Sequence, residues 1–409
     1  MPKHIPRSLE KSILEASANF KVVLLTGPRQ VGKTTLLQSL QKETRRYLTL
    51  DDINLRQAAQ QDPASFLDRL SLPVLIDEVQ YAPNLFPYIK MAVDKSKKNG
   101  LFWLTGSQQF DMMKNITESL AGRVVILQLQ GLSLAEEQGR PHDLPFLPEL
   151  SLLKSRQKTA SPLTLTETYH KIWRGAYPDM VMHRDSKYWD RFYSSYITTY
   201  IQRDVREYLN ISDTTAFHRF MQITAARTGQ LINYADVARD AGVSEPTVKT
   251  WLNVLHASGI VYLLQPYFSN RTKRLVKTPK LYFMDTGLCS WLTGWLSADV
   301  LERGAMSGAM LETWVVAEII KSYIHHGRTP RVYFYRDKDM REVDLMIEEN
   351  GVLYPLEIKK SASVQNMSFK GFSVLSNLGM PIGHGGVICL ARSLTAIGDD
   401  ADVIPVGYL

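Results

Sequence analysis

The sequence predicts an α/β multidomain protein, and three patterns in it support this fold class. Apolar runs alternate with helical periodicity through the first third of the chain, which is typical of a parallel sheet covered by helices. Residues 214–268 show the order helix, tight turn, helix and strand, which indicates a winged helix. Residues 341–359 alternate apolar and polar side chains around an Asn-Gly pair, which predicts an antiparallel hairpin. The expected divisions are a parallel-sheet domain at 1–138, a linker and helical region at 139–213, a winged-helix domain at 214–275 and an α+β domain at 276–409.

The composition is that of an ordinary globular protein, with 44% hydrophobic and 22% charged residues among 409. A net charge of +7 permits contact with nucleic acid without requiring it. The cysteines, Cys289 and Cys389, have no metal-ligand spacing, which excludes a disulfide framework and favours a reducing compartment. No apolar run reaches the roughly 18 residues of a membrane span, and residues 1–7 lack the apolar core of a signal peptide. We therefore expect a cytoplasmic protein without a membrane partner.

A glycine-rich loop lies between an apolar run and a helical pattern near the N-terminus. Its residues are Gly27, Pro28, Arg29, Gln30, Val31, Gly32, Lys33, Thr34 and Thr35. This is the pattern G-x-x-x-x-G-K-[ST] in the strand–loop–helix context that a P-loop needs. Glycines let backbone N–H groups surround phosphate oxygens, and the helix N-terminus adds a positive dipole end. Lys33 is expected to reach the β- and γ-phosphates and Thr34 to bind Mg²⁺. The loop therefore predicts a nucleotide site.

Carboxylates end a later apolar run, as in a Walker B motif. There Asp77 would hold Mg²⁺ through water, and Glu78 would polarise the attacking water. The next apolar run ends in small polar residues, where P-loop ATPases carry a side chain that orients the lytic water. Ser107 or Gln108 is the candidate at that position. A serine that merely caps the following helix is an equal alternative.

Arg123 precedes the last apolar run of the first domain. Its place resembles that of the arginine finger of AAA+ ATPases, and the resemblance implies that it reaches the γ-phosphate bound by a neighbouring subunit and stabilises transition-state charge. The alternative is a surface arginine in a local ion pair. The motifs GPRQVGKTT, LDD, LIDEVQ, LTGSQ and LAGR, followed by GLSLAEE, resemble those of bacterial and archaeal AAA+ ATPases that carry an uncharacterised C-terminal domain. The resemblance covers about the first third of the chain and implies binding and hydrolysis of ATP, with Mg²⁺. It also implies a homo-oligomer, expected to be a ring such as a hexamer.

The winged-helix pattern has a tight turn at Gly242 before its second helix, which a serine caps. If this module binds DNA, the groove-facing candidates are Ser244, Glu245, Thr247, Lys249 and Thr250. The basic run 270–277 would then contact phosphates as a wing. The alternative is packing against the ATPase domain or a protein partner. A glutamate at the head of the helix is unfavourable to phosphate.

Three other patterns have structural interpretations. Residues 139–162 are rich in Pro, Lys, Arg and Ser without a period, and are interpreted as a loop or linker. Aromatic residues recur at helical spacing within 189–209, and this stripe is interpreted as core. Asp285, in an Asp-Thr-Gly triplet, is expected to cap the following helix.

The Asn-Gly turn fixes the register of the C-terminal hairpin. Because the loop has two residues, the residues that flank it pair directly, and counting outward brings Asp344 opposite Glu357. The next pair on the same face is Glu342 opposite Lys359. Carboxylates about 5 Å apart across a ladder are unfavourable unless a cation lies between them. The hairpin therefore predicts a Mg²⁺ site with a lysine beside it.

The skeleton formed by Asp344, Glu357 and Lys359 resembles that of the PD-(D/E)xK, or restriction-endonuclease-like, fold. The resemblance implies that the carboxylates bind Mg²⁺, that Lys359 positions or activates water and that Glu312 is a further acidic residue of the site. No proline precedes Asp344, and Pro355 indicates an edge strand or a bulge that would shift the register. The alternative is a structural set of ion pairs in which the lysine neutralises the carboxylates.

Together these patterns favour an ATP-hydrolysing AAA+ protein, an oligomeric motor or switch that acts on DNA. A second hypothesis is an ATP-controlled protein-interaction switch whose nuclease-like domain is inactive. A third is a Mg²⁺-dependent nuclease gated by ATP. Stimulation of ATP hydrolysis by DNA separates the first hypothesis from the second. DNA cleavage that is lost in Asp344→Ala but retained in Lys33→Ala would support the third.

Overall fold

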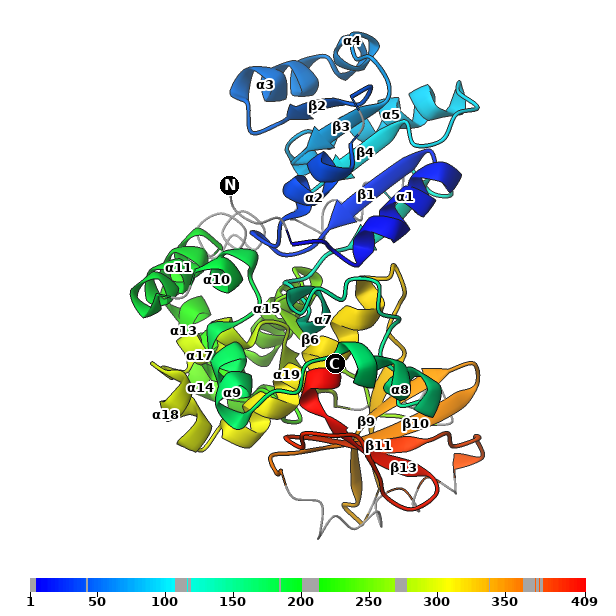
Figure 1. Ribbon diagram of the computed structural model, residues 1–409. Coiled ribbons are helices and arrows are strands. Elements are labelled where there is room, and N and C mark those ends of the chain that lie inside the picture. The colour runs from blue at the N-terminus through cyan, green and yellow to red at the C-terminus, as the bar shows by residue number, and fades with distance from the viewer. Residues whose placement is uncertain are drawn as a thin grey trace.

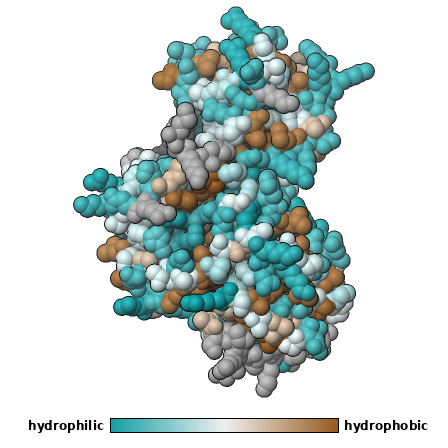
Figure 2. Space-filling view, in the orientation of Figure 1, coloured by the Kyte–Doolittle hydropathy of each residue, from teal (hydrophilic) through white to brown (hydrophobic). Residues whose placement is uncertain are grey.

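A computed structural model shows three parts of the chain (Figure 1). The N-terminal domain lies at the top, a mostly helical middle region at the lower left and a C-terminal sheet at the lower right. A narrower waist separates the N-terminal domain from the rest of the surface (Figure 2). The structure describes residues 5–41, 43–106, 116, 119–183, 185–200, 213–268, 278–337, 339–362, 372, 375 and 378–409. Among these residues no helix combines the length and the apolar character needed to cross a membrane.

A five-stranded parallel sheet forms the centre of the N-terminal domain. Its strands are β1 (Val22–Thr26), β2 (Arg46–Thr49), β3 (Val74–Asp77), β4 (Phe102–Thr105) and β5 (Val124–Gln128). They lie in the order β2-β3-β4-β1-β5, and every neighbouring pair is parallel. All five occur at apolar runs that predicted strands, so the parallel-sheet prediction is confirmed. Because the carboxyl ends of parallel strands meet at one edge, the loops after β1, β3 and β4 come together.

Both faces of this sheet are buried. Its helices are α1 (Leu9–Asn19), α2 (Lys33–Leu40), α3 (Ile53–Gln61), α4 (Pro63–Asp68) and α5 (Leu85–Asp94), with a short 3-10 helix, η1 (Val79–Tyr81). Val23 and Leu25 of β1 pack with α1 and α2, whereas Val22 and Leu24 pack with α3, α4 and α5. This alternation follows from the two-residue period of a strand. The cluster around Val23 continues into the middle region and the C-terminal domain, so one core joins the three parts.

The middle region is built mainly from helices and one small hairpin. Its elements are α7 (Leu134–Glu137), α8 (Leu150–Thr159), α9 (Leu165–Arg174), α10 (Pro178–Met182), α11 (Ser186–Thr199), α13 (Thr214–Ala225), α14 (Tyr234–Ala241), α15 (Glu245–Ala257), β6 (Val261–Leu264), β7 (Lys280–Phe283), α17 (Thr286–Leu292) and α18 (Ala298–Arg303). Trp189, Phe192, Tyr193 and Tyr196 of α11 are buried in contact with one another. Within the described part of that helix, the predicted aromatic core is therefore confirmed.

The prediction of an irregular loop at 139–162 is wrong for its second half, where α8 forms. Leu153 and Arg156 of this helix are buried. Arg156 Nη1 donates to the carbonyl oxygen of Tyr408 at 2.6 Å. Contacts with distant parts of the chain thus stabilise a helix whose sequence has no regular apolar stripe.

The helix pair within 214–268 is present as α14 and α15. Gly242 lies between them with a φ of 73°, as the predicted tight turn requires. Ser244 caps α15, and its Oγ accepts from the N–H of Thr247 at 3.3 Å. The chain then enters β6, which pairs antiparallel with β7. The basic run 270–277, predicted as a wing, lies outside the described residues.

A six-stranded mixed sheet forms the C-terminal domain. Its elements are α19 (Ser307–Ile324), β8 (Val332–Arg336), β9 (Glu342–Glu349), β10 (Val352–Lys359), β11 (Gly385–Cys389), β12 (Thr395–Ala396), β13 (Ala401–Pro405) and the 3-10 helix η4 (Val406–Tyr408). The strand order is β12-β13-β11-β10-β9-β8. The pairs β10–β11 and β11–β13 are parallel, and the others are antiparallel. Helix α19 packs against β10 and β7, so it joins this sheet to the middle region.

The β9–β10 hairpin has the predicted register, with Glu349 paired to Val352 and no slip along the ladder. Asn350 and Gly351 both have positive φ, as a type I′ turn requires. Pro355 lies in an interior strand, so its interpretation as an edge residue or a bulge is wrong. Strand β11 pairs with β10 only from Leu356 onward, so the β10–β11 ladder does not need the N–H group that Pro355 lacks.

Candidate functional site

The loop after β1 adopts a conformation that favours glycine at two positions. Gly27 has a φ of 137°, and a Cβ there would lie 2.0 Å from the carbonyl oxygen of Leu129. Gly32 has a φ of 90° and directly precedes α2. Residues with a side chain rarely adopt these angles. The resulting turn brings backbone N–H groups to the N-terminus of α2, a geometry that suits an anion such as phosphate.

The first residues of α2 lie at the carboxyl end of β3. Lys33 is buried, and its Nζ donates to the carbonyl oxygens of Gly27 at 2.9 Å and Pro28 at 2.7 Å. Thr34 Oγ1 donates to Oδ1 of Asp77 at 2.8 Å. Mg²⁺ prefers oxygen ligands such as a carboxylate. Thr34 and Asp77 therefore fit the metal that accompanies a nucleoside triphosphate.

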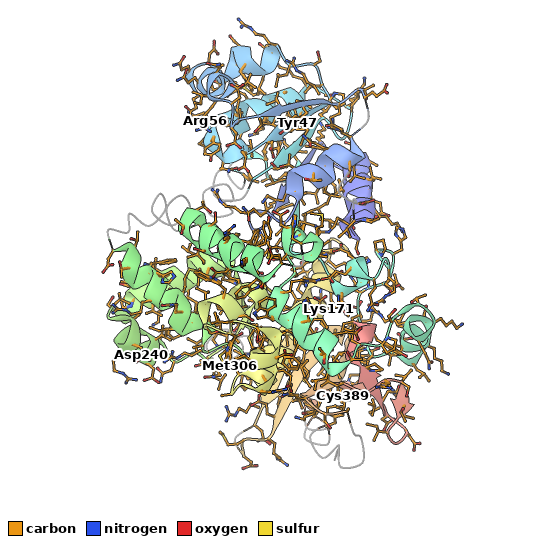
Figure 3. The ribbon with its side chains drawn as sticks, turned by 60° about the vertical axis from the view of Figure 1, so that its left-hand side comes forward. Tyr47, Arg56, Lys171, Asp240, Met306 and Cys389 are labelled. Atoms are coloured by element: carbon orange, nitrogen blue, oxygen red, sulfur yellow. The ribbon has the colours of Figure 1, made fainter. Side chains whose placement is uncertain are left out.

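Two hydroxyl groups that the sequence analysis missed hold Asp77. Tyr47 of β2 (Figure 3) donates to its Oδ2 at 3.2 Å, and Thr105 of β4 donates to its Oδ1. Burial, together with the Asp77 carboxylate, raises the pKa of Tyr47 to about 12. Both partners come from strands near β3 in the sheet. Parallel strands bring their carboxyl ends together at one edge of a sheet, so polar residues near the ends of neighbouring strands could have been predicted to contact Asp77.

Glu78 follows Asp77 with a φ of 57°, in the left-handed region. Its N–H donates to Oγ1 of Thr105 at 3.2 Å, and Gln80 donates Nε2 to its carboxylate. Burial raises the pKa of Glu78 above its ordinary value. A raised pKa makes the carboxylate a stronger base, as removal of a proton from water requires. A non-glycine residue in this backbone region is strained, and such strain gathers at functional sites.

A cleft of about 520 Å³ opens beside this loop. Its lining residues are Arg29, Gln30, Gly32, Lys33, Thr34, Thr35, Glu78, Tyr196 and Thr199. Gly27, Pro28 and Val31 of the predicted loop are not among the lining residues. Tyr196 and Thr199 belong to α11, so the middle region supplies one wall of the cleft. Sequence reasoning missed both, because no motif near them indicates a nucleotide.

Of the other predicted catalytic residues, the structure describes only Arg123, and it does not join this group. Arg123 Nε lies 2.6 Å from Oδ1 of Asp94, and its side chain is 33% exposed. It does not line the cleft of its own chain. Ser107 and Gln108 lie outside the described residues.

A negative charge on the α11 wall is expected to weaken ATP binding. Thr199→Glu places a carboxylate in the cleft with the phosphate-binding loop, and we expect roughly a tenfold loss of affinity at low salt. Thr198→Glu is the matched control, since Thr198 is exposed on the same helix and makes the same hydrogen bond to the fourth residue before it. Titration with a fluorescent ATP analogue measures both variants. Equal affinities would show that α11 does not face the nucleotide.

The C-terminal candidates gather where α19, β9 and β10 meet. Lys359 Nζ lies 2.8 Å from Oε2 of Glu357 and 3.8 Å from Oδ2 of Asp344. Burial, together with the Asp344 carboxylate, raises the pKa of Glu357 to about 7. Asp344 also accepts from the N–H of Ile358 at 2.8 Å. The structure thus brings the predicted carboxylate pair and its lysine together.

Glu312 and Glu342 lie around a second lysine that the sequence analysis missed. Lys280 Nζ is 3.3 Å from Oε1 of Glu312 and 2.5 Å from Oε1 of Glu342. Tyr282 donates its hydroxyl to Glu312 at 2.6 Å. The β9–β10 ladder ends at the pair Leu345–Leu356, so neither predicted pair, Asp344 with Glu357 nor Glu342 with Lys359, is part of it. Glu342 pairs with Lys280 instead. Within the described ranges, no three His, Cys, Asp or Glu residues are arranged to hold a metal ion, so the second Mg²⁺ site stays a prediction.

Comparisons with known proteins bear on each part of the chain. An AAA domain family matches residues 19–137, and two domains of unknown function match residues 166–299 and 307–409. The chain is 31% identical over 344 residues to "Uncharacterized protein Rv2008c" of Mycobacterium tuberculosis, covering 84% of this chain and 71% of that protein. "Uncharacterized protein Mb2031c" of Mycobacterium bovis matches with the same values. A solved Walker-type ATPase of Pyrococcus abyssi has a TM-score of 0.46 at 16% identity, covering 71% of this chain and 96% of that one. A likeness this low carries no functional inference.

The match of residues 19–137 to an AAA domain family and the geometry of the loop place this protein in the class of AAA-type P-loop ATPases, and they support binding and hydrolysis of ATP. P-loop ATPases usually bind ATP together with Mg²⁺. The chain belongs to the same family as the mycobacterial proteins Rv2008c and Mb2031c.

Proposed function

We propose that this ATPase is a nucleotide-driven switch or motor that works as a homo-oligomer on DNA. The observation that supports the proposal is the cleft, whose walls come from the P-loop and from α11 of the middle region. A ligand shifts an equilibrium between two arrangements only by the difference in its affinity for them. If ATP contacts both walls, its affinity differs between an arrangement in which α11 lies beside the P-loop and one in which the middle region has moved away. Binding and hydrolysis of ATP would therefore change the position of the middle region relative to the N-terminal domain.

The residues around the P-loop take separate roles in this proposal. Lys33 exchanges its hydrogen bonds to loop carbonyl groups for bonds to phosphate oxygens. Thr34 and Asp77 would hold Mg²⁺, which would neutralise charge on the phosphates. Glu78, held by Gln80, takes the proton of the attacking water.

The position of Arg123 supports action between subunits. Its side chain is partly exposed and lies outside its own cleft, which leaves it accessible to a neighbouring subunit. The ion pair with Asp94 is the arrangement expected from the alternative, a surface arginine in a local ion pair, so action between subunits requires Arg123 to release Asp94. Such an arginine is worth about 10³-fold or more in turnover. A ring in which each Arg123 completes the next site is the simplest homo-oligomer with this property.

Mixing two inactive variants tests this arrangement. We expect Arg123→Ala to lose turnover by about 10³-fold and Lys33→Ala to lose it through failure to bind ATP. In a mixture, the Lys33→Ala subunit supplies an intact Arg123 to a neighbour with an intact P-loop, so phosphate release returns. A mixture that stays inactive, although both variants assemble, would contradict action between subunits.

Helix α15 presents the residues predicted to contact DNA. Ser244, Glu245, Lys249 and Thr250 are exposed, and Thr247 is half-buried. The hydroxyls of Ser244 and Thr247 hydrogen-bond each other at 2.8 Å, and Thr250 donates to its own helix. Lys249 is therefore our candidate for contact with phosphate.

ATP turnover with and without duplex DNA tests the DNA part of the proposal. We expect DNA to stimulate turnover, less so as salt rises, because phosphate contacts release counterions. Lys249→Glu should reduce the stimulation, whereas Lys97→Glu, a charge reversal at an exposed lysine of the N-terminal domain, should not. Turnover that depends on protein concentration but ignores DNA would favour a switch that binds a protein partner.

A second candidate function is an ATP-gated nuclease that depends on Mg²⁺. The observation that favours it is the closeness of Asp344 and Glu357 to one lysine on the β9–β10 hairpin. Two carboxylates held together bind a divalent cation or share a proton. The alternative, a set of structural ion pairs, has the same geometry without the metal.

The protonation of Glu357 gives this cluster a measurable signature. Its pKa is about 7 in the folded chain against an ordinary value of 4.5, so between those pH values the folded state binds more protons. The free energy of unfolding should therefore fall as pH rises from about 4.5 to 7 and level off above. We expect denaturant unfolding in EDTA to show this slope in wild type and a smaller slope in Glu357→Gln. Equal slopes would contradict the assignment.

Added Mg²⁺ at pH 8 then separates a cation site from ion pairs. A metal that binds the folded state stabilises it in proportion to the logarithm of its concentration. If the site binds Mg²⁺, the melting temperature rises for wild type and not for Glu357→Gln. DNA cleavage lost in Asp344→Ala but retained in Lys33→Ala would establish the nuclease. Absence of any Mg²⁺ effect favours the ion pairs.

A further inference from the structure

A buried arginine lies directly behind the P-loop. Arg7, which precedes α1, is 5% exposed. Its Nη1 donates to the carbonyl oxygen of Val31 at 2.9 Å, and its Nη2 donates to that of Gln130 at 2.7 Å. Val31 belongs to the P-loop, whereas Arg7 lies outside both the loop motif and the range matched by the AAA family. The chain thus fixes a backbone group of its nucleotide loop from a distant segment.

The hydrogen bond from Arg7 to the carbonyl oxygen of Val31 also orients the N–H group of Gly32. A trans peptide is planar, so the carbonyl of Val31 and the N–H of Gly32 point in opposite directions. Holding the carbonyl on Arg7 therefore aims that N–H away from Arg7, and Gly32 lines the cleft. Backbone N–H groups in such loops bind phosphate oxygens. Arg7 is thus a positioning residue that acts through the loop.

Glu136 holds Arg7 in place. Arg7 Nε lies 3.1 Å from Oε2 of Glu136, whose side chain is fully buried. The N–H groups of Ser8 and Ser133 donate to the same carboxylate at 2.8 and 2.9 Å. Burial opposes ionisation here, but the neighbouring charge of Arg7 and the ring of His325 hold the pKa of Glu136 well below its ordinary value. The carboxylate is therefore a fixed negative partner for the arginine.

His325, the residue after α19, contacts the same carboxylate from the C-terminal domain. Its Nδ1 lies 3.3 Å from Oε1 of Glu136, and its Nε2 accepts from the N–H of Gln130 at 3.2 Å. Burial lowers the pKa of His325, although the Glu136 carboxylate acts in the opposite direction. Because Nε2 is the acceptor, the ring proton lies on Nδ1, toward Glu136. Removal of His325 would loosen both Glu136 and the Gln130 segment that Arg7 binds.

Two more polar residues of α19 bind the connection between β5 and α7. Glu318 accepts from the N–H of Leu134 at 2.7 Å, and Lys321 donates to the carbonyl oxygen of Leu132 at 2.8 Å. Glu318, Lys321 and His325 follow one another at helical spacing on a mostly apolar helix. Figure 1 shows α7 between the N-terminal domain and α19. Buried hydrogen bonds of this kind make a structure rigid, so they hold α19 against the connection between β5 and α7.

A separate ion cluster secures the other side of the junction. Glu137 Oε2 lies 2.5 Å from Nζ of Lys171, which Figure 3 labels near the middle of the molecule. Glu137 Oε1 lies 2.6 Å from Nη2 of Arg174. Both cations belong to α9, so the segment that carries Glu136 is anchored to the middle region as well.

We propose that these contacts couple ATP binding to the docking of α19. His325 fixes Glu136, Glu136 fixes Arg7, and Arg7 sets the phosphate-binding geometry of the loop. Coupling of this kind is reciprocal, so displacement of α19 weakens ATP binding and bound ATP favours the docked helix. The proposal rests on ATP binding at the cleft and names the part of the C-terminal domain that responds to it.

Titration of the full-length protein with a fluorescent ATP analogue tests this coupling. His325→Leu removes both ring nitrogens, and we expect a loss of about tenfold in affinity. The matched control is His326→Leu, because the neighbouring His326 is half-buried and its ring bonds backbone groups of Ser322, at 2.7 Å from Nδ1, and of Asp143. We expect the control to stay within about twofold of wild type. Equal affinity of His325→Leu and wild type would overturn the proposal.

A double-mutant cycle tests whether Arg7 and His325 act through one connection. Arg7→Met is expected to weaken ATP binding at least as much as His325→Leu, and the double variant should lose little more, since both changes remove the same link. Losses that add would overturn the proposal. If Arg7→Met does not fold, Glu136→Gln replaces it in the cycle. Failure of wild type itself to bind ATP would refute the nucleotide site, whereas binding that is unaffected in His325→Leu refutes the coupling alone.

Discussion

Glu78→Gln is expected to lower the turnover number for ATP by about 10²- to 10⁴-fold while ATP affinity stays within about threefold. The amide keeps the size of the side chain, but it cannot take the proton of the attacking water. Burial raises the pKa of Glu78 and so makes its carboxylate a better base. Phosphate release measures turnover, and titration with an ATP analogue measures affinity.

The matched control for this variant is Asp51→Asn. Asp51 follows β2 in the same sheet, yet it does not line the cleft. If loss of negative charge near the site were the cause, both variants would lose turnover alike. We expect Asp51→Asn to stay within about threefold of wild type. Wild-type turnover in Glu78→Gln would remove Glu78 from the mechanism.

Asp285→Ala is expected to cause the largest loss of stability, about 3–5 kcal/mol in the free energy of unfolding. Asp285 is buried and accepts from the N–H groups of Leu288 and Ala176, both at 2.7 Å. Tyr193 donates its hydroxyl to the same carboxylate at 2.8 Å. Alanine would leave all three donors buried without this acceptor, and each such donor costs about 1–3 kcal/mol. Denaturant unfolding of the full-length protein measures the loss.

Asp52→Ala is the control, because Asp52 also caps a helix. It accepts from the N–H groups of Asn54 and Leu55 at 2.8 and 3.1 Å, but at an exposed position. Water replaces the lost cap there, so we expect a cost of about 1 kcal/mol. Similar losses in the two variants would show that Asp285 is only a cap and does not hold α11 and α17 together.

The parts of the site that the sequence predicted are those whose residues are adjacent in the chain. The P-loop places Lys33 and Thr34 through the local turn that its glycines permit, and β3 carries Asp77 at its end. The β9–β10 register follows in the same way, since Asn350 and Gly351 fix it within the turn. These features depend on local backbone geometry, so they can be predicted from a single sequence.

The parts that escaped prediction depend on packing between distant segments. Thr199 reaches the cleft only because α11 packs across the P-loop, and Arg7 reaches Val31 because α1 lies against the sheet. Lys280 meets the acidic residues of the C-terminal domain from a strand of the middle region. In each case no local motif shows which distant segment the residue contacts. Asp285 was predicted as a helix cap, but its hydrogen bond with Tyr193 of α11 also depends on packing between distant segments.

The most direct test of this account is phosphate release by wild type and Lys33→Ala across a range of protein concentrations. The central claim is that ATP is hydrolysed in the cleft beside the P-loop by an assembled oligomer. We predict that wild-type turnover per subunit rises with protein concentration and that Lys33→Ala shows none. Turnover that survives in Lys33→Ala, or that is absent from wild type at every concentration, would contradict the account.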